Sequence, residues 1–189
     1  MKKLRLNELL FLALCCVFGL ISKRLIAPFA NVITDAIHIP GGVGTSFSIM
    51  FLVIAVELFP RRRCGIIMGI VQSVLAFALG QVGSMGLLAP IGYAVPGIVV
   101  DVVLRLLERS RLNRRDRMML ANAAASVSAC LTANVIVFHL SGLPLLLYCC
   151  VAATTGTLCG SLGAGVAERL QGISALQMHT PFETKEDAA

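Results

Sequence analysis

The chain has 189 residues, of which 57% are hydrophobic and 14% charged, with a formal net charge of +6 at pH 7. Soluble domains contain about 45–50% apolar residues, so this composition and a mean hydropathy of +0.87 place the chain in the membrane class. The positive charges stand mostly in short clusters between apolar runs, a pattern that encodes membrane orientation rather than nucleic-acid binding.

Seven cysteines are present, nearly all inside apolar runs and without a CxxC pair. This pattern predicts neither a disulfide framework nor a zinc site, and we interpret the thiols as small packing residues. No His, Cys and Glu cluster has metal-ligand spacing, so we expect no metal and no cofactor.

The first predicted membrane helix covers residues 7–29 and follows a basic cap. No small-x-small cleavage pattern comes after it, so we expect an uncleaved helix rather than a signal peptide. Pro28 is expected to kink or end this helix. Cys15 and Gly19, four residues apart, would let another helix approach closely.

Lys23 and Arg24 lie near the outer end of this first span, where basic residues are unexpected. One interpretation is that both side chains snorkel to the headgroups. The other is that they line a pocket and contact an anionic group.

Residues 31–44 are too polar and too short to span a bilayer, and they contain Pro40 and several glycines. Interrupted backbone at membrane depth is tolerated where it lines a cavity or is covered by protein. We therefore predict a short helix and loop at the outer face, over a pocket.

Five more spans are predicted, at residues 45–59, two within the hairpin 64–107, 118–140 and 145–166. The cytoplasmic segments, among them residues 61–63 and 108–117, all carry Lys or Arg, whereas the outer segments carry none. This asymmetry predicts an all-α integral membrane protein, a bundle of six transmembrane helices with both termini cytoplasmic. Residues 1–170 would form that bundle, in a bacterial or archaeal type of cell membrane, and residues 171–189 a polar cytoplasmic tail.

Three short stretches carry a family resemblance: FANVI at residues 29–33, GIVQ at 69–72, and Gly-x-x-x-Asp-x-Val at 97–103. With the hydropathy pattern over most of residues 7–170, they resemble the substrate-binding S component of an energy-coupling factor transporter. The likeness is nearest to the members for thiamine or its hydroxymethylpyrimidine precursor. Cys15 and Gly19 stand where many members have an Ala-x-x-x-Ala motif that meets the coupling subunit, and the aromatic residues typical of thiamine binders are few.

The resemblance implies a subunit that captures a small heterocyclic vitamin or precursor at its outer face. It would deliver that ligand to a membrane coupling subunit and two ATPase subunits. The chain has no GxxxxGK[ST] motif, so ATP hydrolysis would come from a partner. No catalytic set is evident, and we predict that the chain is not an enzyme.

Polar groups inside spans are costly and are therefore candidates for substrate binding. Asp35 and His38 share a helical face, so they either pair with each other or contact the ligand. Asn31 either caps the short helix or binds the ligand. Gln72 lies in the middle of the third span and Gln81 near its outer end. Each either forms a hydrogen bond between helices or binds the ligand.

Further candidates lie in the later spans. Asp101 either forms an i,i+4 ion pair with Arg105 or contacts a cationic ligand. Asn134 and His139 occupy the outer half of the fifth span. His139 either binds the ligand or lies in the headgroup layer. We expect the pocket to be walled by spans one, three, five and six.

Two charge patterns at the cytoplasmic side have simpler interpretations. Glu57 is expected to form an interfacial salt bridge with Arg61, one turn away. The basic segments would contact anionic lipid of the bilayer and border the coupling partner.

Two other function classes remain open. A small ion-coupled secondary transporter would be supported by internal repeats, and we find none between residues 1–90 and 91–189. A structural membrane subunit would bind no ligand. Loss of uptake on disabling a partner ATPase separates the S component from a secondary carrier.

Overall fold

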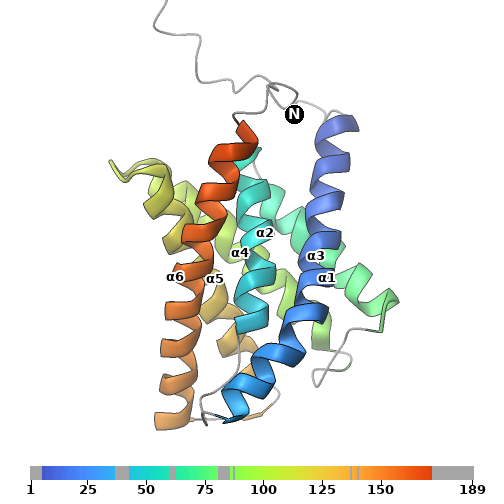
Figure 1. The fold of residues 1–189 in the computed structure, drawn as a ribbon, viewed down its shortest axis with the longest axis vertical. Helices are drawn as coiled ribbons and strands as arrows, with labels where there is room; N and C mark the ends of the chain where they lie inside the picture. The colour runs from blue at the N-terminus through green and yellow to red at the C-terminus, as the bar shows by residue number, and fades with distance from the viewer. Residues whose placement is uncertain are drawn as a thin grey trace, which may run out of the picture.

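The structure is a computed structural model that describes residues 6–36, 43–59, 63–80, 86, 88–136, 138–139 and 141–171. These residues form six α-helices and no strand, which confirms the all-α prediction (Figure 1). The helices are α1 (Leu6–Ala36), α2 (Val43–Leu58), α3 (Cys64–Ala78), α4 (Ala89–Glu108), α5 (Arg114–Ile136) and α6 (Leu143–Gln171). The end of the bundle where α1 begins and α6 ends is called the terminal end, and the opposite end the distal end (Figure 1).

Three of the described helices are long and apolar enough to cross a membrane: Ala89–Glu108, Arg114–Ile136 and Leu143–Leu170. Helices α2 and α3 are apolar but shorter. Large apolar side chains cover much of the outer surface, and Leu158 and Leu162 of α6 are 68% and 60% exposed. Such a surface is unfavourable in water, so the three helices indicate association with a membrane. Six spans and cytoplasmic termini stay predictions.

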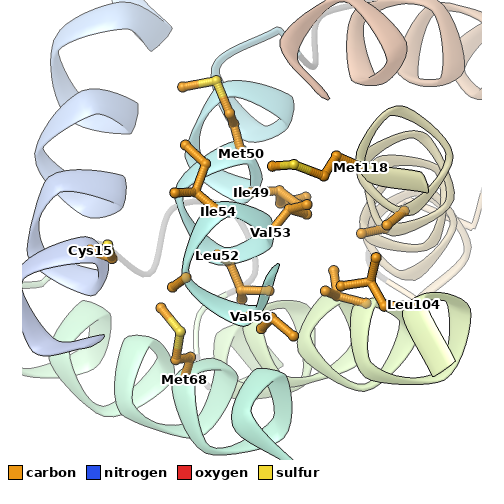
Figure 2. Close-up of a cluster of buried hydrophobic side chains, with 14 of the residues drawn as sticks. Cys15, Ile49, Met50, Leu52, Val53, Ile54, Val56, Met68, Leu104 and Met118 are labelled. Atoms are coloured by element: carbon orange, nitrogen blue, oxygen red, sulfur yellow. The ribbon is translucent and has the colours of Figure 1, made fainter. Parts of the chain in front are cut away.

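Helix α2 is the central element and contacts all five other helices. Its successive residues Leu52, Val53, Ile54 and Ala55 are all at least 98% buried, so α2 has no solvent-facing side there. Figure 2 shows its side chains pointing outward in several directions, toward the surrounding helices. A helix that is apolar all round belongs in the middle of a bundle.

Helix α1 is longer than its apolar run predicts. It passes through Pro28 and includes residues 30–36, instead of ending near residue 29. Pro28 removes one backbone hydrogen bond, and α1 changes direction in its C-terminal part, as Figure 1 shows. Residues 30–36 contain no Gly or Pro that would stop the helix. The prediction for residues 37–42 lies outside the described residues.

Helices α5 and α6 also extend beyond their apolar runs. Helix α5 begins at Arg114, four residues before the predicted span, and has Asp116 in its first turn. Helix α6 continues through Glu168 and Arg169 to Gln171. The residues that extend these helices are mostly Arg, Ala, Glu, Leu and Gln, which have high helix propensity, so the helices continue where hydropathy predicts an end.

Glu57 and two arginines form a charged cluster at the terminal end. Glu57 Oε1 lies 3.2 Å from Arg114 Nε and accepts a hydrogen bond from Arg117 at 3.0 Å. The Glu57 side chain is 11% exposed and each arginine side chain 25%. This acid therefore ties α2 to the start of α5, while the predicted partner Arg61 lies outside the described residues.

We expect Glu57→Gln to lower the free energy of unfolding by about 2 kcal/mol, because two partly buried guanidinium groups lose their shared counter-charge. Thermal unfolding of the detergent-solubilised protein measures the loss. The control is Glu168→Gln, since Glu168 is exposed on α6. Equal stability of the two variants would contradict a role for the cluster.

Candidate functional site

Gln72 is a buried polar group at the junction of three helices. It lies on α3 with 4% exposure, and its amide Nε2 has no hydrogen-bond partner. A Cβ built on Gly19 of α1 would lie 2.9 Å from Nε2 and 3.3 Å from Ser48 Oγ of α2. Glycine at position 19 therefore provides the space in which the carboxamide sits between α1 and α2.

A Lys–Tyr pair borders this junction. Lys23 lies four residues after Gly19, on the same face of α1. Its Nζ donates a hydrogen bond to Tyr93 Oη at 3.1 Å and stands 4.6 Å from the centre of the Tyr93 ring. The Tyr93 backbone of α4 also packs on Gly69, one turn before Gln72 on α3. Lys23 thus contacts a phenol and an aromatic face across the helices.

We call this set the Gln72 cluster, and it draws residues from α1, α2, α3 and α4: Gly19, Lys23, Ser48, Gln72 and Tyr93. Gln72 and Lys23 were candidates from the sequence, whereas Tyr93 and Ser48 had no predicted role. The pocket was predicted among spans one, three, five and six, but the walls of this cluster include α2 and α4. Nothing in the sequence singles out Ser48, because only the packed bundle turns this part of α2 toward Gly19.

Asp101 has a different role and lies away from the Gln72 cluster. Its Oδ1 accepts the backbone N–H of Gly65 and its Oδ2 that of Ile66, both at 3.0 Å. The Asp101 carboxylate, 3% exposed, therefore caps the first turn of α3 from α4. The predicted pair with Arg105 is present at 3.9 Å, on the same Oδ2. Sequence spacing reveals only this local pair. The cap cannot be found this way, because Asp101 is 36 positions from Gly65 and 35 from Ile66 in the sequence.

The other described candidates do not join the cluster. Asn134 donates to Cys130 of its own helix, at 2.9 Å to the carbonyl oxygen and 3.2 Å to Sγ. Arg24 is exposed. His139 was predicted inside the fifth span, but α5 ends at Ile136, and His139 is exposed beyond its end. The side chains of Asn31, Asp35, His38 and Gln81 lie outside the described residues, so their roles stay predictions.

Cys15 and Gly19, predicted to pack against a partner helix, pack within this chain. Cys15 is 6% exposed and belongs to the apolar core, and Gly19 faces α2 and α3. A contact between this pair and a coupling subunit stays a prediction.

A second buried polar set, which the sequence did not reveal, lies between α2, α5 and α6. Asn122, with 0% exposure, donates to Gly156 O at 2.7 Å and to Ser46 O at 3.4 Å. Ser46 Oγ lies 3.1 Å from Thr155 Oγ1. Asn122 Oδ1 and Ser126 Oγ are buried without a partner. The sequence gives no signal for Asn122, because it lies near the start of the predicted span, where a polar residue needs no explanation.

A groove of about 400 Å³ lies between α3 and α4, lined by Ser73, Val74, Phe77, Ala78 and Pro90. Ser73 Oγ already donates to Ile70 O at 2.8 Å, so the groove is otherwise apolar. It has the size of a small-molecule site but no free polar group, and the Gln72 cluster therefore remains the better candidate. In the part of the chain that the structure describes, no group of three or more His, Cys, Asp or Glu residues could hold a metal ion.

Fold and site together define a helical bundle with membrane-length helices and a buried polar cluster at a helix junction. No protein-family model, curated protein or solved structure matches the chain.

Proposed function

We propose that the chain is the substrate-capture subunit of an ATP-driven importer of the energy-coupling factor type. Its ligand would be a small heterocyclic vitamin or precursor, bound at the Gln72 cluster. The partners would be a membrane coupling subunit and two ATPase subunits. The sequence resemblance motivates this assignment, and the Gln72 cluster supports it.

The observation that carries the proposal is the unpartnered amide of Gln72. A buried donor without an acceptor costs about 1–3 kcal/mol, and the cost is felt most where no water can reach the group. A ligand that offers an acceptor, such as a ring nitrogen or carbonyl, would remove this cost on binding.

The Lys23–Tyr93 pair supplies the other features that a heterocycle needs. The Tyr93 ring presents an aromatic surface on which a flat ligand can stack. Lys23 Nζ lies over one face of that ring and adds a positive charge there, so a flat ligand would stack on the opposite face. In the predicted topology, the cluster lies in the outer half of the bundle, because Ser48 and Tyr93 come early in helices that start at the outer face.

We expect Gln72→Leu to weaken ligand binding by about tenfold to a hundredfold, the effect of losing one buried hydrogen bond. The apparent Tm should stay equal or rise, because leucine removes an unsatisfied donor. Calorimetry with the purified protein and a vitamin panel measures binding, after mass spectrometry of copurified small molecules names the ligand.

The control is Asn134→Leu, which removes an amide that bonds only to its own helix and should leave binding unchanged. Wild-type affinity in Gln72→Leu would overturn the site. Uptake that persists when the partner ATPases are disabled would instead indicate an ion-coupled carrier.

A further inference from the structure

A second groove, of about 340 Å³, lies between α5 and α6 at the terminal end. It is lined by Arg115, Ser161, Leu162, Gly165, Val166 and Arg169. Gly165 leaves its floor open, because a Cβ built there would meet nothing within 4 Å. The groove therefore combines two cations with an apolar wall.

The two arginines of this groove differ from their neighbours. Arg114 and Arg117 pair with Glu57, and Arg105 pairs with Asp101. Within the described ranges, neither Arg115 nor Arg169 forms an ion pair. Arg115 instead donates to Ser161 Oγ at 3.0 Å, which holds its guanidinium over α6.

An apolar stripe continues from the groove toward the middle of α6. Leu158, Leu162 and Val166 follow one another at four-residue spacing, on one face of the helix. They are 68%, 60% and 42% exposed. The stripe passes Arg115, which is held at Ser161, ends three residues before Arg169, and runs about 12 Å along the helix, given a rise of about 1.5 Å per residue.

We propose that this groove binds an anionic glycerophospholipid. Its phosphate would lie between Arg115 and Arg169, where guanidinium groups bind phosphate in a bidentate manner. An acyl chain would lie along the stripe of Leu158, Leu162 and Val166. Two cations next to an apolar helix face match a lipid better than a free anion, which would use only the cations. The proposal requires membrane association but not the import function.

The first test is native mass spectrometry of the detergent-purified protein, titrated with phosphatidylglycerol or with phosphatidylcholine. We expect phosphatidylglycerol to bind about tenfold more tightly, since each basic residue near an anionic headgroup adds to the attraction. Arg115→Gln with Arg169→Gln should abolish this preference. The matched control, Arg109→Gln with Arg111→Gln, removes two exposed arginines outside the groove, so it lowers only the general attraction to anionic lipid and should keep most of the preference. Equal loss in both double variants would overturn the site in favour of nonspecific charge.

A second variant blocks the groove without changing charge. Gly165→Leu places a side chain in open space, so the fold should persist while phosphatidylglycerol binding falls about tenfold or more. Unchanged binding would overturn the proposal. Glycerol phosphate, which lacks acyl chains, should not displace the lipid, and displacement at equal concentration would indicate a site for free phosphate instead.

Discussion

Asp101→Ala should be among the most destabilising single substitutions in this protein. The carboxylate accepts two backbone N–H groups at the start of α3, from Gly65 and Ile66, at 3.0 Å each. Alanine leaves both donors without that acceptor, and hydrogen bonds to charged groups contribute about 1.5–3 kcal/mol each. We expect a loss of about 3 kcal/mol, which corresponds to an apparent Tm lower by about 10 °C.

Two further variants separate the cap from charge alone. Asp101→Asn keeps one carbonyl oxygen that can accept one of the two N–H groups, so we expect about half of the loss. Glu108→Gln removes an acid from an exposed position on the same helix and should change stability by less than about 0.5 kcal/mol. Thermal unfolding in detergent measures all three. Equal stability of Asp101→Ala and Glu108→Gln would show that the cap contributes nothing.

Asp101→Asn also tests whether Asp101 binds a ligand or only stabilises the fold. If Asp101 contacted a cationic ligand, Asp101→Asn would lose affinity in the fraction that remains folded. If it only caps α3, that fraction should bind as the wild type does. The two N–H contacts favour the second outcome, because they use both carboxylate oxygens.

The helices were predictable because apolar runs determine most of them. Residues 45–59 were predicted as the second span, and α2 covers Val43–Leu58. The bounds of α1, α5 and α6 were less predictable, because a helix continues past an apolar run when the next residues favour it. Hydropathy identifies the part of a helix that suits lipid, not the residue at which the helix ends.

The candidate site was predictable only in part. Gln72 stood out because a glutamine in the middle of an apolar span is costly. The Lys23–Tyr93 contact joins residues 70 positions apart, and no local spacing reveals it. Asn134 looked equivalent to Gln72 in sequence, yet it bonds to its own helix. The difference depends on which neighbour each amide meets after packing.

Gly160→Ala should be strongly destabilising, whereas Gly165→Ala on the same helix should not. A Cβ at position 160 would lie 2.7 Å from Met119 Cα and 2.9 Å from Met118 O, which are backbone atoms of α5. Helices α5 and α6 would have to separate, and such overpacking costs about 1–3 kcal/mol. At position 165 the added methyl meets nothing within 4 Å, and alanine favours a helix by up to about 1 kcal/mol over glycine.

Thermal unfolding of the two variants in one detergent gives the comparison, and equal Tm values would contradict the close contact between α5 and α6. Gly156→Ala extends the test, since a Cβ there would lie 2.7 Å from Ala123 Cα. The same separation would lengthen the hydrogen bond from Asn122 to Gly156 O, now 2.7 Å. Gly156→Ala and Asn122→Ala should therefore be less than additive, because each weakens the same contact. Additive losses would mean that the buried amide and the close helix approach stabilise the bundle independently.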